Sequence, residues 1–206
     1  TPSIPDKNII DEYLKNLKII PFKIINENKL IKIRESKIDL SAIAKGYAVD
    51  ELSNYLISFG LHNHMVDIGG EVYCSGKNKS GKPWSIGIQY PDEYSNNTAI
   101  DLILLSNKAV ATSGNYRNRV IIDGVSYTHI INPKTGYPVN NNILSATVIA
   151  DNCMISDAYA TALMVMDKEK GKRFIESRNN TEAIIFYKDE EGIKSIKTSG
   201  FNDYEN

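Results

Sequence analysis

The sequence carries a pair of oxygen-bearing side chains at a spacing that suits a metal ion. Asp157 and Thr161 stand four residues apart in a segment rich in alanine, and side chains at that spacing share one face of a helix. A carboxylate and a hydroxyl about one turn apart suit a hard cation such as Mg²⁺ or Ca²⁺. The alternative interpretation is that Asp157 only caps its helix.

A second group of polar residues lies where a predicted strand runs into a predicted helix. Asp39 and Lys45 stand on either side of Ser41, a favourable N-cap residue. The N-terminus of a helix offers unpaired backbone N–H groups and the positive end of the helix dipole, and both favour an anion. The alternative is a capped helix whose Asp39 and Lys45 face water.

Two more polar residues stand next to predicted turns. Ser113 ends a strand, and His129 precedes a turn at residues 132–136, where Asn-Pro and Thr-Gly pairs break regular structure. A histidine at the end of a strand either transfers protons or fills a structural role. Paired glycines at 69–70 predict a tight turn, with close approach of a ligand to the backbone as the alternative.

The other histidines and the cysteines give weaker signals. His62 and His64 share one strand face but have no third ligand nearby in sequence, so we expect them to be structural. Cys74 and Cys153 are far apart and form no CxxC pair, which excludes a zinc knuckle or a disulfide scaffold. Both thiols are expected to be small buried side chains.

Hydrophobic periodicity predicts the elements that position these residues. Apolar residues at helical spacing predict helices over residues 9–17, 41–59, 154–166 and 168–177. A hairpin is expected at 22–33, followed by strands at 64–68, 71–75, 84–89, 100–105, 109–112, 119–122, 145–150, 183–187 and 192–197. Blocks of strands without strict strand–helix alternation favour an α+β fold with a mostly antiparallel sheet. No repeat or linker interrupts residues 1–206, so one domain is expected.

The composition excludes several classes of protein. The chain has 206 residues, 42% of them hydrophobic, which is typical of a folded globular protein. Nucleic-acid binding needs a surplus of basic charge, and 24 Lys and Arg against 25 Asp and Glu supply none. No apolar stretch approaches the ~20 residues that span a bilayer.

Five motifs follow one another along the chain. They are Asp39-Leu40-Ser41-Ala42-Ile43-Ala44-Lys45-Gly46-Tyr47-Ala48-Val49-Asp50, Ile68-Gly69-Gly70, Ala111-Thr112-Ser113-Gly114, His129-Ile130-Ile131-Asn132-Pro133-Lys134-Thr135-Gly136 and Asp157-Ala158-Tyr159-Ala160-Thr161-Ala162-Leu163. In this order they closely resemble the ApbE family of flavin transferases. The resemblance implies an α+β, T-fold-like architecture of helices on a mostly antiparallel sheet.

The sequence departs from the family pattern in a few places. Asn132 stands where the family commonly has Asp, and Glu71 where Asp is usual after the glycine pair. Both differences are expected to tune the placement of the substrate. Family members also usually begin with an extra segment that contributes to the flavin site. The resemblance therefore implies that residues 1–206 form one ApbE-like domain trimmed at its N-terminus.

The resemblance implies an Mg²⁺-dependent transfer of FMN. FAD is split at its pyrophosphate, FMN is joined to a Thr or Ser hydroxyl of an acceptor protein, and AMP leaves. Asp157 and Thr161 match metal ligands, with Ala42 as a ligand through its backbone carbonyl. Flavin-contacting positions are matched by Asp39, Lys45, Ser113 and Ile131. His129 is the candidate base that activates the acceptor hydroxyl, since its usual pKa near ~6.5 suits neutral pH.

Two other functions use the same site. If water replaces the acceptor hydroxyl, the protein is an FAD pyrophosphatase, and without turnover it is a flavin-binding protein. The resemblance further implies a location outside the cytoplasm, with a lipid anchor on the full-length protein. It also implies an acceptor such as a subunit of a membrane redox complex, and no nucleic-acid partner.

Overall fold

The core of the fold is an antiparallel sheet. The computed structural model describes residues 4–17, 20–27, 29–91, 99–115, 119–122 and 125–205. Within them, six strands pair in the order β12-β11-β10-β7-β4-β3, and every pair is antiparallel. The strands are β3 (His64–Ile68), β4 (Glu71–Ser75), β7 (Lys108–Gly114), β10 (Ile143–Ala150), β11 (Glu182–Asp189) and β12 (Gly192–Lys197).

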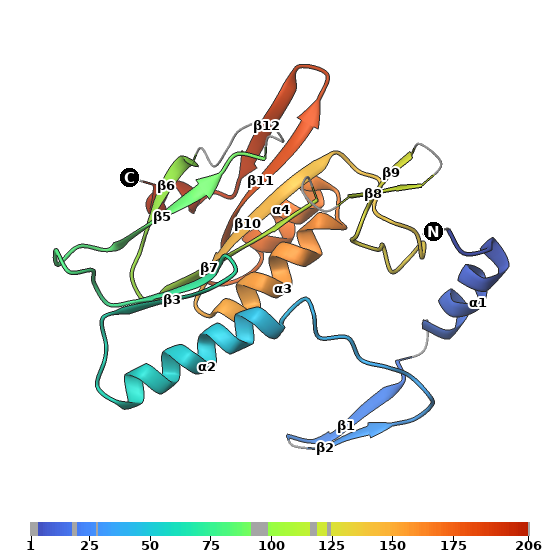
Figure 1. Cartoon of the computed structure of the whole chain (residues 1–206), viewed down its shortest axis with the longest axis horizontal. Coiled ribbons are helices and arrows are strands. Elements are labelled where there is room, and N and C mark those ends of the chain that lie inside the picture. Colours follow the sequence, from blue (N-terminus) through green and yellow to red (C-terminus); the bar gives the residue numbers. More distant parts are fainter. Residues whose placement is uncertain are drawn as a thin grey trace.

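Both faces of this sheet are covered (Figure 1). Helices α2 (Ala44–Ser58), α3 (Cys153–Met164) and α4 (Lys168–Glu176) lie on one side. The hairpin of β5 (Trp84–Gln89) and β6 (Ala99–Leu105), with the short helix η1 (Phe201–Tyr204), packs on the other. In β11, Ile184 and Phe186 join the hairpin's hydrophobic cluster, whereas Ala183 and Ile185 join the cluster under the helices. The predicted α+β class and mostly antiparallel sheet are confirmed.

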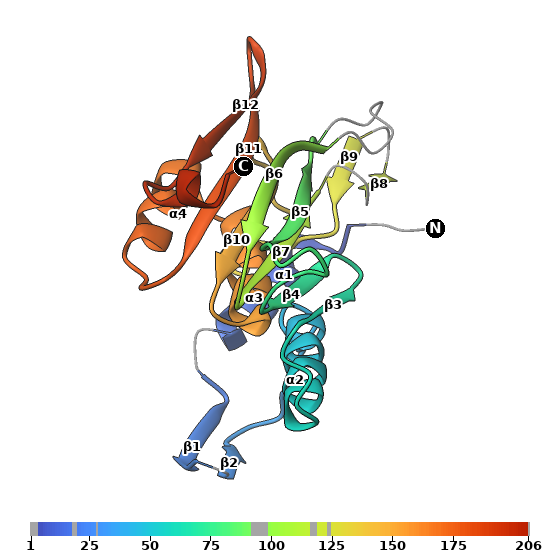
Figure 2. The same ribbon diagram turned by 90° about the vertical axis from the view of Figure 1, so that its left-hand side faces the viewer.

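The N-terminal elements lie apart from the sheet. Helix α1 (Lys7–Leu17) precedes a hairpin of β1 (Phe22–Asn26) and β2 (Lys29–Lys32), which projects from the rest of the protein in Figures 1 and 2. All described residues of the two strands are at least partly exposed. Ile10 of α1 is buried, and its side chain lies beside Gly136. Helix α1 therefore packs against the loop that follows His129.

Two smaller features complete the fold. A second hairpin pairs β8 (Arg119–Ile122) with β9 (Val125–Thr128), a strand that the periodicity did not predict. The turn between β3 and β4 is the predicted tight turn, since Gly69 and Gly70 have φ of 64° and 96°. None of the helices in the described part of the chain is both long and apolar enough to cross a bilayer.

The predicted start of α2 is wrong. The helix begins at Ala44, its N-cap is Ile43, and no side chain caps it. Ser41 instead donates its backbone N–H and its hydroxyl to Asp39 Oδ1, at 2.8 and 2.5 Å. Local bonds from serine and aspartate side chains compete with helix formation. The turn at Asp39 therefore delays the helix by three residues.

Candidate active site

A cavity of about 590 Å³ opens where α2, α3 and the sheet meet the loop after β9. It brings together all eight residues that the sequence nominates for flavin, metal or proton transfer: Asp39, Ala42, Lys45, Ser113, His129, Ile131, Asp157 and Thr161. These residues come from four segments that lie far apart in the sequence: 39–45, 113, 129–131 and 157–161. The cavity lining therefore supports their assignment to one site, although their individual roles stay predictions.

Asp157 joins α3 to the start of α2. Asn152, not Asp157, caps α3, because its side chain accepts the backbone N–H of Ile155 at 2.9 Å. Asp157 is 3% exposed, and its Oδ2 accepts the backbone N–H of Gly46 at 3.1 Å. The interpretation of Asp157 as the cap of its own helix is therefore wrong.

The same hydrogen bond affects the carbonyl of Ala42. In a regular helix the N–H of Gly46 would donate to the carbonyl four residues earlier, which is that of Ala42. Here the N–H turns to Asp157, and no described backbone N–H donates to Ala42. The carbonyl oxygen of Ala42 is therefore available at the cavity wall beside Asp157.

Close contact between α2 and α3 makes this arrangement possible. A Cβ added to Gly46 would lie 2.7 Å from the carbonyl carbon of Cys153 and 2.8 Å from the Cα of Met154. Asp50, one turn along α2, accepts the backbone N–H groups of Cys153 and Met154 at 2.7 and 2.9 Å. The first turn of each helix thus receives a carboxylate from the other helix.

Substitution of Gly46 tests the close contact between α2 and α3. We expect Gly46→Ala to lower the free energy of unfolding by about 1–3 kcal/mol, because backbone atoms block the new methyl group. This is a net loss: the new contacts are with backbone atoms under 3 Å away, so the clash outweighs the ~1 kcal/mol that alanine contributes through helix propensity. Denaturant unfolding checks the change, with the exposed Glu51→Ala in the same helix as control. Equal stability of Gly46→Ala and wild type would contradict the packing.

The metal candidate Thr161 is held by Ser113. The hydroxyls of the two side chains lie 3.0 Å apart, which joins α3 to the end of β7. A hydroxyl has one donor and two acceptor positions, so Thr161 keeps a lone pair for a cation while it bonds to Ser113. Ser113, predicted to contact flavin, thus also orients Thr161.

Lys45 forms an ion pair with an acid that sequence reasoning did not place in the site. Its Nζ lies 2.6 Å from Oε1 of Glu71, whose side chain is 4% exposed while that of Lys45 is 50% exposed. Burial raises the pKa of the Glu71 carboxyl, with Lys45 opposing the shift and the charge of Asp157 adding to it. The alternative that Lys45 only faces water is wrong.

His129 and Ile131 line the cavity from a loop rather than from a helix. Both side chains are exposed and line the cavity, on the segment that follows β9. A bridge between Ile131 and Pro138 closes the loop after His129.

The hydrogen bonds from Ser41 lower the pKa of Asp39, which keeps that carboxyl charged beside the cavity.

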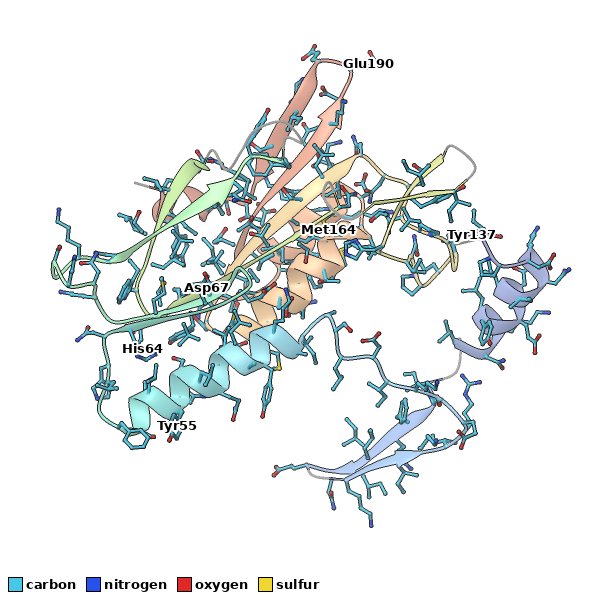
Figure 3. All side chains as sticks on the ribbon, viewed as in Figure 1. Tyr55, His64, Asp67, Tyr137, Met164 and Glu190 are labelled. Atoms are coloured by element: carbon cyan, nitrogen blue, oxygen red, sulfur yellow. The ribbon has the colours of Figure 1, made fainter. Side chains whose placement is uncertain are left out.

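His64 and the two cysteines have structural roles. His64 is the first residue of β3, and its side chain lies beside α2 (Figure 3), where its ring nitrogens are 2.8 Å from Ser53 Oγ and from the carbonyl oxygen of Leu61. Both cysteines are buried, and burial raises the pKa of the Cys74 thiol to about 12. The structural role expected of His64 and the burial expected of both cysteines are confirmed.

Comparison with known proteins identifies the family. The chain matches the ApbE family over residues 1–185. The FAD:protein FMN transferase of Vibrio cholerae is 42% identical over 181 residues, which cover 87% of this chain and 54% of that protein. Its namesake from Escherichia coli K12 is 30% identical over 206 residues, covering 98% and 58%. The chain belongs to the ApbE family.

Solved ApbE structures share the fold. The flavin transferase ApbE from Vibrio cholerae has a TM-score of 0.85 at 37% identity and is matched over 99% of this chain and 64% of its own. The ApbE protein of Thermotoga maritima gives 0.85 at 33% identity, over 99% and 65%. The chain thus spans a little over half the length of these two curated relatives and about two thirds of these solved chains.

The ApbE cavity has the oxygen donors that Mg²⁺ prefers. Asp157 supplies a carboxylate, Thr161 a hydroxyl and Ala42 a carbonyl, and no nitrogen or sulfur ligand lies among them. The described residues contain no group of three or more His, Cys, Asp or Glu side chains that could hold a metal ion by themselves. Mg²⁺ typically takes one or two carboxylates and completes its shell with water and substrate phosphates. The residues present therefore fit Mg²⁺.

Proposed function

We propose that this ApbE chain transfers FMN from FAD to a Thr or Ser hydroxyl of an acceptor protein and releases AMP, in a reaction that requires Mg²⁺. Its similarity to the FAD:protein FMN transferases of Vibrio cholerae and Escherichia coli supports the transfer. The observation that carries the proposal is the gathering of metal, anion and proton-transfer candidates around one cavity.

The charges of the cavity explain why a cation would be needed. Its wall carries three carboxylates, those of Asp39, Glu71 and Asp157, and one lysine, Lys45. The pyrophosphate of FAD is itself anionic, and phosphoryl transfer proceeds mainly through positioning and neutralisation of such charge. Lys45 alone cannot offset this excess. Bound Mg²⁺ would neutralise phosphate oxygens and withdraw charge from the breaking bond.

The protein's own residues divide the remaining work. Lys45 lies in the first turn of α2, where its ammonium group can donate to a phosphate oxygen while it also donates to Glu71. His129 takes the proton of the acceptor hydroxyl as that oxygen bonds to the phosphorus of the FMN half. The phosphorus–oxygen bond to the AMP half then breaks, and AMP departs with the bridging oxygen.

One experiment separates this function from its two alternatives. The protein is mixed with FAD, Mg²⁺ and a candidate acceptor, and the products are separated on a denaturing gel. A fluorescent acceptor band supports transfer. Free FMN and AMP without that band support an FAD pyrophosphatase, and unchanged FAD supports a flavin-binding protein. Omitting Mg²⁺ should abolish the fluorescent band.

The location and the acceptor are proposals that rest on the family resemblance alone. We propose that the full-length protein works outside the cytoplasm on a lipid anchor, and that its acceptor is a subunit of a membrane redox complex. Cell fractionation with detection of the protein tests the location. Flavin fluorescence on gels of membrane proteins, with and without the transferase, tests the acceptor.

Substitution of Lys45 tests whether the phosphates of FAD bind at the N-terminal end of α2. We expect Lys45→Ala to weaken FAD binding by about 1–3 kcal/mol, because a charge-assisted hydrogen bond to phosphate is lost. The lower end is favoured, since the side chain is 50% exposed and partly screened by solvent. Calorimetric titration with FAD measures the change, and the exposed Lys37→Ala is the control. If Lys45→Ala bound FAD with wild-type affinity, Lys45 would not contact the phosphates of FAD.

A further inference from the structure

Glu71 is the buried acid of the cavity whose second oxygen the proposed reaction leaves unused. It is the first residue of β4, directly after the Gly69-Gly70 turn, and it is 3% exposed. Oε1 accepts the 2.6 Å bond from Lys45, whereas Oε2 has no hydrogen-bond partner in the described part of the chain. A buried carboxylate oxygen is costly unless a donor reaches it. The Oε2 atom thus marks a position where a donor is expected.

The neighbours of Glu71 indicate what kind of donor fits. Asp157 is close enough to raise the pKa of Glu71 through its negative charge, and both carboxylates line the same cavity. Lys45 compensates only one of these two charges. Position 69 carries no side chain, and a Cβ there would lie 3.8 Å from Oε2. Glycine at that position therefore places no side-chain atom against this buried oxygen.

We propose that Glu71 is a positioning residue of the cation site: its Oε2 accepts a hydrogen bond from a water bound to Mg²⁺, while its Oε1 holds Lys45. The inference rests on the proposed function, which places Mg²⁺ at Asp157 and Thr161. Mg²⁺ loses its waters reluctantly, so most of its shell needs partners that orient those waters. Glu71 thereby connects the cation to the lysine that binds the phosphates.

The opposing interpretation is that Glu71 is only a counterion for Lys45. The two roles predict different effects of Glu71→Gln once Lys45 has been replaced by alanine. If Glu71 acts on the cation directly, its loss weakens metal binding in the Lys45→Ala background as well. If Glu71 acts only through Lys45, its loss has no further effect in that background.

Mn²⁺ binding, followed by electron paramagnetic resonance without FAD, distinguishes these roles. Glu71→Gln keeps the side-chain volume and is expected to weaken Mn²⁺ binding by roughly 10–100-fold, the usual effect of losing a group that orients metal ligands. Glu71→Gln should weaken Mn²⁺ binding in the Lys45→Ala background as well. The loss in Glu71→Gln should persist in 1 M KCl, where the screening length is about 3 Å and distant charges no longer act.

The outcomes separate this inference from the proposed function. Asp157→Asn must lose Mn²⁺ affinity if the cation site is correct, so a normal Asp157→Asn, or a wild type that binds no Mn²⁺, overturns both. A weakened Asp157→Asn beside a Glu71→Gln within threefold of wild type overturns only the role of Glu71. Equal Mn²⁺ affinity of Lys45→Ala and the double variant Lys45→Ala/Glu71→Gln also overturns it. Should Glu71→Gln alone not fold by thermal melting, the double variant Lys45→Ala/Glu71→Gln decides: Mn²⁺ affinity below that of Lys45→Ala supports the proposal, and equal affinity overturns it.

Discussion

Asp157→Asn is expected to lower Mg²⁺-dependent FMN transfer by several orders of magnitude while the protein stays folded. The substitution removes the carboxylate charge that would bind the dication. The asparagine oxygen can still accept the 3.1 Å bond from the backbone N–H of Gly46, so the contact between α2 and α3 survives. The amide then places N–H donors where the cation needs an oxygen. Initial rates at increasing Mg²⁺, with FAD and an acceptor, measure the loss.

A matched substitution outside the cavity controls for this result. Asp11 lies on the exposed side of α1 and takes no part in the cavity lining, so Asp11→Asn should transfer FMN like wild type. Thermal melting of Asp157→Asn should stay within a few degrees of wild type. If Asp157→Asn kept normal Mg²⁺ dependence, Asp157 would not be a metal ligand, and its buried carboxylate would serve only to join the two helices.

The fold was largely predictable because its strands and helices have strong patterns. The strands at 64–68, 71–75, 84–89, 119–122 and 192–197 agree with the structure to the residue. Strands β10 and β11 are covered on both faces and therefore read as apolar runs rather than alternating ones. Helix starts were less accurate, since the N-cap of α2 depends on whether Ser41 bonds forward to the helix or back to Asp39. Short-range pattern does not decide between these two bonds.

The residues that line the site were predictable from the sequence, but the hydrogen bonds and ion pairs between them were not. Motifs nominated residues that line one cavity, yet the bond from Gly46 to Asp157 joins positions 111 residues apart and has no local signal. The availability of the Ala42 carbonyl follows from that bond and was therefore equally hidden. Glu71 was interpreted as a departure from the family pattern that tunes substrate placement, and its ion pair was not predicted. Its pairing with Lys45 depends on how β4 is registered against its neighbours, which no single sequence segment reveals.

His129→Asn is expected to slow transfer to the acceptor by at least a hundredfold at neutral pH, with nearly normal melting and FAD binding. Loss of a general base typically costs ~10² to 10⁴ in rate. Asparagine keeps a hydrogen-bonding side chain but does not titrate between pH 5 and 8. Because the His129 side chain is exposed at the cavity rather than packed in the core, its removal should leave stability almost unchanged.

Two control substitutions separate catalysis from structure. His62→Asn makes the same change at an exposed histidine outside the cavity and should leave the transfer rate unaltered. His64→Asn breaks the contacts to Ser53 and Leu61, so it should lower the melting temperature without a specific effect on rate. If His129→Asn behaved like His64→Asn, melting early yet keeping most of its specific activity, His129 would belong to the scaffold. The base would then have to be sought at Asp157 or in the neighbours of the acceptor hydroxyl, because those groups would be the remaining candidates to take the proton.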